Sequence, residues 1–288
     1  MCYLSPEGVV LGADSTSTYI HTGLHFYNHN QKLYELGQNS ALAVLTWGLG
    51  GLQGLSHRTL MARLADDLEI HQPTTLMEVA QRWVDLFYPV YMTDPSVQLF
   101  GQLTAKAPHN PATPPNSLMR TAQEQQLFTA LRDNLVVGFC LGGRVAAGRI
   151  PGAYSVVFDP NGVKPTPDPI PMGSYRFWGA PNMVHRLMFG YDIGLTDAVL
   201  SSGKWNGSRA DLESVLQQYH LNHPVIPIRD AVDFVYSCIH STIKALKFSI
   251  FAQVCGGPIE VAVITTDRPF RWVRHKAWDA AITDGEQG

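Results

Sequence analysis

Long apolar runs are missing from this 288-residue chain, and so are runs of a single charge. No segment approaches the roughly 18 consecutive apolar residues that a membrane helix needs, so we expect no membrane span. Lysine and arginine are not clustered and the formal net charge is -3, which argues against a nucleic-acid partner. No basic stretch followed by an apolar run opens the chain, so we expect a cytoplasmic protein.

Cysteine is also scarce, with four residues scattered along the chain. Metal and redox motifs need closely spaced cysteines, and this sequence has none. The eleven histidines show no ligand spacing either, so we expect neither a metal nor a cofactor. This scatter favours reduced, mostly buried thiols at Cys2, Cys140, Cys238 and Cys255, and structural roles for His57, His185 and His240.

Apolar residues make up 45% of the chain, enough to bury one large core, and we expect a single domain over residues 1–288. Short apolar runs bounded by turn residues predict strands, and apolar residues at helical spacing predict helices. Strands and helices occur in separate groups, which indicates an α+β fold. Strands are predicted at 9–13, 31–36, 41–45, 135–141, 153–158 and 259–264, and helices at 52–68, 77–87, after a capping box at 208–211, and at 231–246. We expect the first three strands to be consecutive antiparallel neighbours, the strands at 135–141 and 153–158 to form a second hairpin, and the apolar stripe of the helix at 231–246 to lie on a sheet.

The segment 93–116 is rich in proline, asparagine and threonine without a sustained period of apolar residues, and it predicts an exposed insertion.

Near the start of the chain, the tetrad 5–8 (Ser-Pro-Glu-Gly) predicts a tight hairpin turn. If the turn centres on Pro6 and Glu7, facing positions in the hairpin sum to thirteen. Cys2 would then face Leu11, and the residue opposite Asp14 would lie two before Met1.

Five groups of short motifs follow one another in an informative order. They are Gly8-Val-Val-Leu-Gly-Ala-Asp14-Ser15, Asn30-Gln-Lys32-Leu, Val136-Val-Gly-Phe with Gly142-Gly143, Ala153-Tyr-Ser with Asp159-Pro-Asn-Gly162 and Met172-Gly-Ser174, and Cys255-Gly-Gly-Pro-Ile-Glu-Val261. In this order and spacing they resemble the proteasome β-subunit family. The resemblance covers most of the chain outside insertions at about 93–121 and 196–227.

The resemblance implies an amino-terminal nucleophile (Ntn) hydrolase with a four-layer αββα sandwich. In that family an N-terminal threonine attacks a peptide carbonyl, and its own α-amine relays the proton. By position, Asp14 and Lys32 match the acidic and basic residues beside the nucleophile, Gly48 the oxyanion-hole glycine and Ser174 a supporting serine. The resemblance further implies a peptide or protein substrate, self-association into rings and a possible ATPase partner.

The chemistry explains why these residue types are needed. A hydroxyl is a poor nucleophile at neutral pH, and it needs a base and a cation that favours its deprotonated form. Lys32 could supply the cation, and Asp14 could hold its charge and position. A backbone N–H at Gly48 could approach the developing oxyanion. Taken singly, however, Lys32 is typical of a solvated edge-strand charge, Asp14 of a turn residue and Ser174 of a loop hydroxyl.

Two departures from the family keep three hypotheses open. The expected threonine falls just upstream of Met1, and Ala252 and Cys255 stand where the family pattern has an acidic residue and a serine. The first hypothesis is a threonine peptidase that starts upstream, and the second is an inactive structural or interaction subunit. The third is a Cys2-dependent amidohydrolase, although Cys2 would lie roughly 10 Å of strand from Asp14 at ~3.3 Å per residue.

Overall fold

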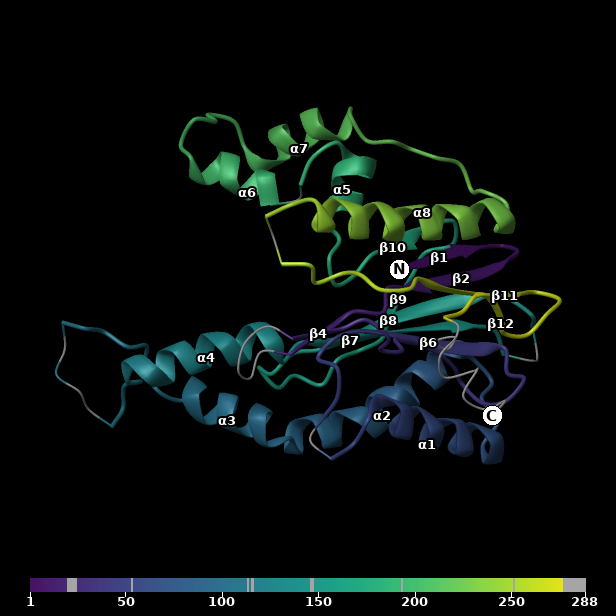
Figure 1. Ribbon diagram of the computed structural model, residues 1–288, viewed down its shortest axis with the longest axis horizontal. Coiled ribbons are helices and arrows are strands. Elements are labelled where there is room, and N and C mark those ends of the chain that lie inside the picture. Colours follow the sequence, from purple (N-terminus) through teal and green to yellow (C-terminus); the bar gives the residue numbers. More distant parts are fainter. Residues whose placement is uncertain are drawn as a thin grey trace, which may run out of the picture. The chain divides into compact units, whose positions relative to one another are not determined.

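The computed structural model describes residues 1–19, 25–52, 54–112, 114, 117–145, 148–192, 194–250 and 252–276. Within this part of the chain, the fold is mixed α+β, with two antiparallel five-stranded sheets and eight helices (Figure 1). The predicted α+β class is confirmed. The chain divides into two compact units, one made of Met1–Lys32, Pro171–Val263 and the chain from Arg271 onward, and the other of Leu33–Ile170 and Ile264–Phe270.

The first unit contains a sheet with the strand order β10-β1-β2-β11-β12. Its hairpin β1–β2 pairs Ser5 with Gly8 and Cys2 with Leu11, so the predicted register, in which facing positions sum to thirteen, is confirmed. The strands are β1 (Cys2–Ser5), β2 (Gly8–Ala13), β10 (Tyr175–Arg176), β11 (Glu260–Thr265) and β12 (Arg271–Arg274). The final strand predicted from the sequence corresponds to β11.

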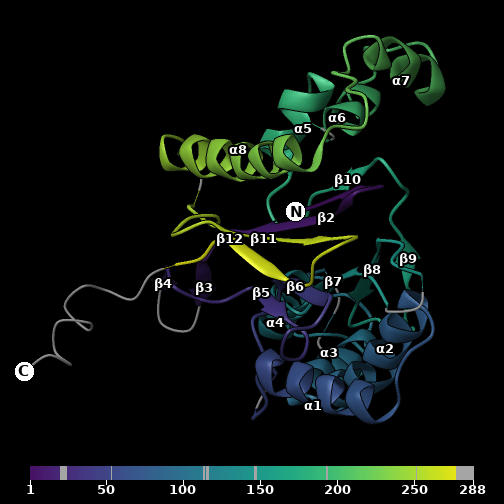
Figure 2. The ribbon, with the colours of Figure 1, turned by 90° about the vertical axis from the view of Figure 1, so that its right-hand side faces the viewer.

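Helix α8 (Ile228–Lys247) packs directly on the sheet of the first unit (Figure 2). A β-carbon on Gly12 would lie 2.4 Å from Val235 Cγ1, so the helix can approach β2 this closely only over a glycine. The prediction that the apolar stripe of this helix lies on a sheet is confirmed. The predicted capping box is also present, because Ser208 and Asp211 exchange hydrogen bonds at the start of α7. The remaining helices of this unit are α5 (Asn182–Phe189), α6 (Gly194–Ser201) and α7 (Arg209–Gln217).

The second unit contains a sheet with the order β5-β6-β7-β8-β9, covered by α1 and α2. Aromatic rings fill its core, with Phe139 of β7 packed against Trp83 and Phe87 of α2. The predicted hairpin joining β7 and β8 is confirmed. The elements are β5 (Leu33–Glu35), β6 (Leu42–Gly48), α1 (His57–Ile70), α2 (Leu76–Thr93), β7 (Val137–Gly143), β8 (Gly152–Phe158) and β9 (Asp168–Pro169).

The expectation that the strands at 9–13, 31–36 and 41–45 are consecutive antiparallel neighbours was right for the last two and wrong for the first. β5 and β6 pair antiparallel as expected, but β2 belongs to the other sheet, where it lies between β1 and β11. Between β2 and β5 the chain forms a separate two-stranded sheet instead. Its strands are β3 (Ser17–Tyr19) and β4 (His25–Tyr27).

The proline-rich segment is not only an exposed insertion, because it contains helix α3 (Pro95–Thr104). Asp94 caps this helix by accepting a hydrogen bond from Ser96 N, and Pro95 occupies the first turn, where its missing N–H costs nothing. The side chains of Val97, Phe100 and Leu103 are buried. Helix α4 (Ala122–Asn134), for which we made no prediction, packs beside α3 through stacked rings of Phe100 and Phe128.

Candidate active site

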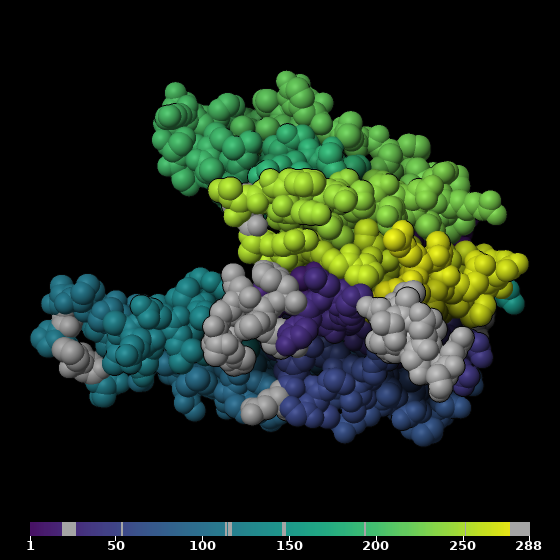
Figure 3. Space-filling model, viewed as in Figure 1, coloured from purple at the N-terminus to yellow at the C-terminus, as the bar shows by residue number. Residues whose placement is uncertain are grey.

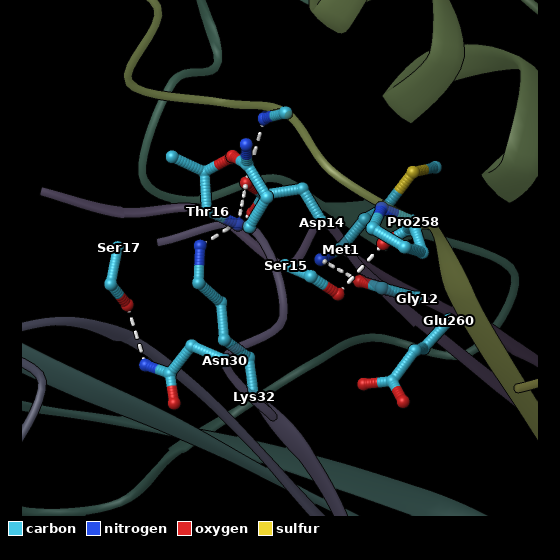
Figure 4. Close-up of polar contacts among 12 residues, drawn as sticks. Met1, Gly12, Asp14, Ser15, Thr16, Ser17, Asn30, Lys32, Pro258 and Glu260 are labelled. Carbon is cyan, nitrogen blue, oxygen red and sulfur yellow. Dashed lines mark hydrogen bonds and ion pairs between the residues drawn. The ribbon is translucent and has the colours of Figure 1, made fainter. Parts of the chain in front are cut away.

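An ion pair between Asp14 and Lys32 forms the centre of the candidate site (Figure 4). Asp14 directly follows β2, and Lys32 directly precedes β5. Lys32 Nζ lies 2.6 Å from Asp14 Oδ1, and the two side chains are only 18% and 13% exposed. The structure therefore brings together the two charged residues that the sequence singled out, and the ammonium points at the carboxylate rather than into open water.

The carboxylate of Asp14 is held from a second direction by backbone N–H groups. Its Oδ2 accepts hydrogen bonds from Thr16 N and Gly256 N, each at 3.0 Å. Gly256 lies in the loop before β11, far from Asp14 in sequence but beside it in space. The position of the carboxylate is thus fixed by the adjoining backbone, by the distant loop before β11 and by Lys32.

The thiol of Cys255 interacts with both members of this pair. Burial raises the pKa of Cys255 to about 12, and the neighbouring negative charge of Asp14, whose carboxylate also hydrogen-bonds this thiol, acts in the same direction. Because the thiol stays protonated at neutral pH, it is not a nucleophile there. It contributes a weak S–H donor at the position where the family pattern has a serine.

A network of backbone hydrogen bonds joins the segments around the pair. Ser15 N donates to Gly256 O at 2.9 Å, and Ser15 Oγ donates to Pro258 O at 2.7 Å. Gly257 has a φ of +71°, and a β-carbon there would lie 2.4 Å from Asn28 O. Gly257 of the Gly-Gly pair in this loop is thus required by the close approach of two backbones.

The start of the chain is a regular part of the sheet. The ammonium of Met1 donates to Gly12 O at 2.8 Å, and Gly12 N donates to Met1 O at 2.9 Å. Cys2 is completely buried and faces Leu11, three residues before Asp14. The structure therefore does not bring the Cys2 thiol to the ion pair.

Ser174 does not join the pair either. Its backbone oxygen accepts a hydrogen bond from Leu4 N, and its hydroxyl donates to Pro171 O at 2.6 Å. Leu4 faces Val9, five residues before Asp14, which corresponds to roughly 16 Å along an extended strand. Ser174 therefore lies toward the turn end of the hairpin, and the supporting role expected for it remains a prediction.

Gly48 ends strand β6 in the second unit. Its φ is +80°, and a β-carbon there would lie 2.2 Å from Val136 O, so the local backbone requires glycine. Leu49 N, the next N–H along the chain, donates to Val136 O at 3.0 Å. The oxyanion-hole role of Gly48 remains a prediction.

Sequence reasoning missed a second charged cluster in the first unit. Glu260 is fully buried at the start of β11, and its carboxylate oxygens lie 2.8 Å from His275 Nδ1 and 3.3 Å from Lys276 Nζ. Figure 4 places Glu260 beside the segment that carries Ser15. The sequence did contain a signal for this cluster, a single acidic residue inside an otherwise apolar strand. Such a residue needs a buried partner, so Glu260 could have been selected as a candidate.

A scan against protein-family models and a search of curated proteins found no match to this chain. None of the described helices has the length and apolar character needed to cross a membrane. Among the described residues, no group of three or more His, Cys, Asp or Glu side chains is arranged to hold a metal ion. Any function proposed for the site depends on its own geometry.

Proposed function

We propose that the chain is a proteasome-like Ntn hydrolase that cleaves peptide bonds, with its nucleophilic threonine just upstream of Met1. The observation that carries this proposal is the partly buried Asp14–Lys32 ion pair, with a distance of 2.6 Å between Nζ and Oδ1. A cation fixed at one point favours the deprotonated form of a hydroxyl placed beside it. Asp14 supports this arrangement because it restricts where the ammonium can lie.

The hairpin register supports the same location for the nucleophile. Facing positions in β1 and β2 sum to thirteen, and the hydrogen-bonded pair of Met1 and Gly12 continues that register. An upstream residue that extended the pairing would face Ala13, and the residue before it would face Asp14. A threonine near that position would therefore lie beside the ion pair.

In the proposed reaction, the threonine hydroxyl attacks the carbonyl carbon of a peptide bond, and its proton passes to the α-amine of the same residue. The ammonium of Lys32 stabilises the negative charge on the attacking oxygen, and a backbone N–H stabilises the carbonyl oxygen, the role that the sequence resemblance assigns to Gly48. When the carbon–nitrogen bond breaks, the α-ammonium returns its proton to the leaving amine. Water then hydrolyses the remaining ester and frees the threonine.

The wider family properties belong to the same proposal. They are the four-layer αββα arrangement, assembly into rings, a peptide or protein substrate, a possible ATPase partner and a cytoplasmic location. Their only support is the sequence resemblance.

A second candidate is an inactive subunit with a structural or interaction role. Ala252 replaces the acidic residue of the family pattern, and Cys255 places a thiol with a raised pKa beside Asp14. Both changes remove polar support near the proposed nucleophile. A Cys2 amidohydrolase has no comparable support, since Cys2 is fully buried and faces Leu11.

The test combines identification of the mature N-terminus with a cleavage assay. Intact mass and N-terminal sequencing would be measured on protein purified from its natural source, and a panel of fluorogenic peptides would report hydrolysis. We expect a threonine terminus, cleavage by the native protein, and loss of cleavage in Lys32→Ala without loss of the fold. Lys164→Ala is the matched control, because Lys164 also pairs with an aspartate at 2.6 Å but is exposed in the second unit.

Each other outcome selects a different hypothesis. A retained Met1 with no cleavage of any peptide would support the inactive subunit. An exposed Cys2 terminus with amide hydrolysis would support the amidohydrolase. Undiminished turnover in Lys32→Ala would count against both enzymatic hypotheses.

A further inference from the structure

Glu260 is an unusual residue for the centre of a sheet, because its side chain has no exposure to solvent. Its carboxylate is balanced by two basic residues that follow β12, with His275 Nδ1 at 2.8 Å and Lys276 Nζ at 3.3 Å. A buried carboxylate is tolerated in a protein interior only when such partners compensate for its lost hydration. The pairing therefore fixes the end of β12 to the start of β11.

Lys276 also reaches a third segment of the chain. Its Nζ donates a hydrogen bond to Asn30 O at 3.0 Å, and its side chain is only 14% exposed. Asn30 precedes Lys32 by two residues. Figure 3 shows the early segment, coloured purple, beside the C-terminal segment, coloured yellow, on one face of the molecule. One ammonium thus joins the buried acid of β11 to the backbone that carries Lys32.

The same backbone is attached to the Asp14 side of the site. Asn30 N donates to Ser15 O at 3.0 Å, and Ser15 Oγ donates to Pro258 O, two residues before Glu260. These contacts link Glu260 to Lys276, Lys276 to Asn30, Asn30 to Ser15, and Ser15 to the loop before β11. A displacement of Lys276 would therefore shift the backbone that carries Lys32.

We propose that Glu260 and Lys276 form a positioning pair that sets the place of Lys32 against Asp14. Neither residue reaches the ion pair itself by any contact described above, and both act through the backbone oxygen of Asn30. A methionine at position 276 would leave both the carboxylate and that oxygen without this partner. The consequence for catalysis rests on the proposed function, whereas the consequence for the position of Lys32 does not.

The first test measures the reactivity of the Lys32 amine directly. Folded protein would be acetylated with limiting reagent, and labelling of each lysine would be followed by mass spectrometry of its peptides. In the double variant Glu260→Gln/Lys276→Met, which leaves no unpaired buried charge, we expect Lys32 to react roughly fivefold faster than in the wild type. Glu260→Gln alone keeps the bond from Lys276 to Asn30, so we expect an increase of only about twofold.

Two controls make the result specific. Arg274→Met removes a positive charge from the end of the same strand, but Arg274 contacts the Tyr236 ring and hydroxyl rather than Asn30. Labelling of Lys32 should be unchanged in that variant. Lys164, in the second unit, should react at the same rate in all variants. If Lys32 reacts at the wild-type rate in folded Glu260→Gln and in the folded double variant, the positioning role is wrong; if the double variant does not fold, the Glu260→Gln result decides.

The second test uses peptide hydrolysis. A positioning role predicts a lower kcat in the folded variants with little change in KM, because Lys32 acts on the reacting oxygen and not on substrate binding. A role confined to stability would leave the kcat of the folded fraction unchanged, which would contradict the proposal. If Lys32 labelling rises but the wild type cleaves no peptide, the positioning pair stands and the proposed function fails.

Discussion

The N–H of Gly256 donates a hydrogen bond to Asp14 Oδ2, at 3.0 Å, across more than 240 residues of sequence. Thr16 N donates to the same oxygen, and Lys32 Nζ contacts the other. Asp14 is therefore more than the partner of one lysine. Its carboxylate joins the end of β2 to the loop before β11, and it also contacts Lys32 and the Cys255 thiol.

This arrangement predicts an order of stability among variants of the pair. Asp14→Ala removes the acceptor of Lys32, of two backbone N–H groups and of the Cys255 thiol, and it should lower the free energy of unfolding by about 2–3 kcal/mol. Lys32→Met leaves the carboxylate with two N–H donors, and because the pair is partly exposed it should cost less than about 1 kcal/mol. Urea denaturation followed by circular dichroism would measure both. Equal losses in the two variants would show that the backbone donors to Asp14 contribute little.

Local signals in the sequence were sufficient to predict the hairpin and to identify Asp14 and Lys32 as candidate site residues. The turn at Pro6 and Glu7 fixes the register of β1 and β2, because a two-residue turn leaves only one pairing of the flanking strands. Asp14 and Lys32 were found through motifs at the strand ends. Their contact followed from the resemblance to a known family and could not have been derived from spacing alone.

The features that the sequence did not predict have different physical causes. The proline-rich composition of 93–116 predicts an exposed insertion, yet aspartate followed by proline, as at Asp94 and Pro95, is also a helix start, and it begins α3. Strand β11 lies beside β2 although their sequences are far apart, and no local pattern encodes such a neighbour. The partners of Glu260 could not be identified for the same reason, since His275 and Lys276 reach it only through the pairing of β11 with β12.

The described cysteines should be unreactive in the native protein. All four are buried and none forms a disulfide within the described part of the chain, and burial raises the pKa of both Cys238 and Cys255 to about 12. Alkylation at pH 8 requires an accessible thiolate, so native protein should incorporate almost no label, while protein in denaturant should incorporate four. Mass spectrometry of labelled peptides would identify the sites. Rapid native labelling at Cys255 would mean that the loop before β11 opens readily.

The backbone at Gly48 should tolerate no side chain. Gly48→Ala combines a φ of +80° with a contact of 2.2 Å between the new β-carbon and Val136 O, and we expect a loss of about 2 kcal/mol or more. Gly50 is the matched control, because a β-carbon there would meet nothing within 4 Å. Gly50→Ala should change the free energy of unfolding by less than about 0.5 kcal/mol. A comparison of urea midpoints would check the difference, and a harmless Gly48→Ala would show that the end of β6 can rearrange.

Acid should destabilise the second unit through His57. Its side chain is 3% exposed and packs against Phe87 and Phe139, with ring centroids 5.8 and 5.2 Å away. Burial lowers the pKa of His57 to about 4 from an ordinary value of 6.5. As the pH falls below 6.5, the unfolded chain therefore binds a proton that the folded protein accepts only near pH 4. This one residue should lower the free energy of unfolding by about 3 kcal/mol between pH 7 and pH 4.

The variant His57→Leu should remove this part of the pH dependence, whatever its effect on stability at pH 7. Unfolding in urea would be measured from pH 7 to pH 4, and the quantity to compare is the slope of the free energy of unfolding against pH. His71→Gln serves as the control, because His71 is exposed at the end of α1 and pairs with Asp67. If His57→Leu loses stability in acid as steeply as the wild type, His57 is not the group that takes up the proton.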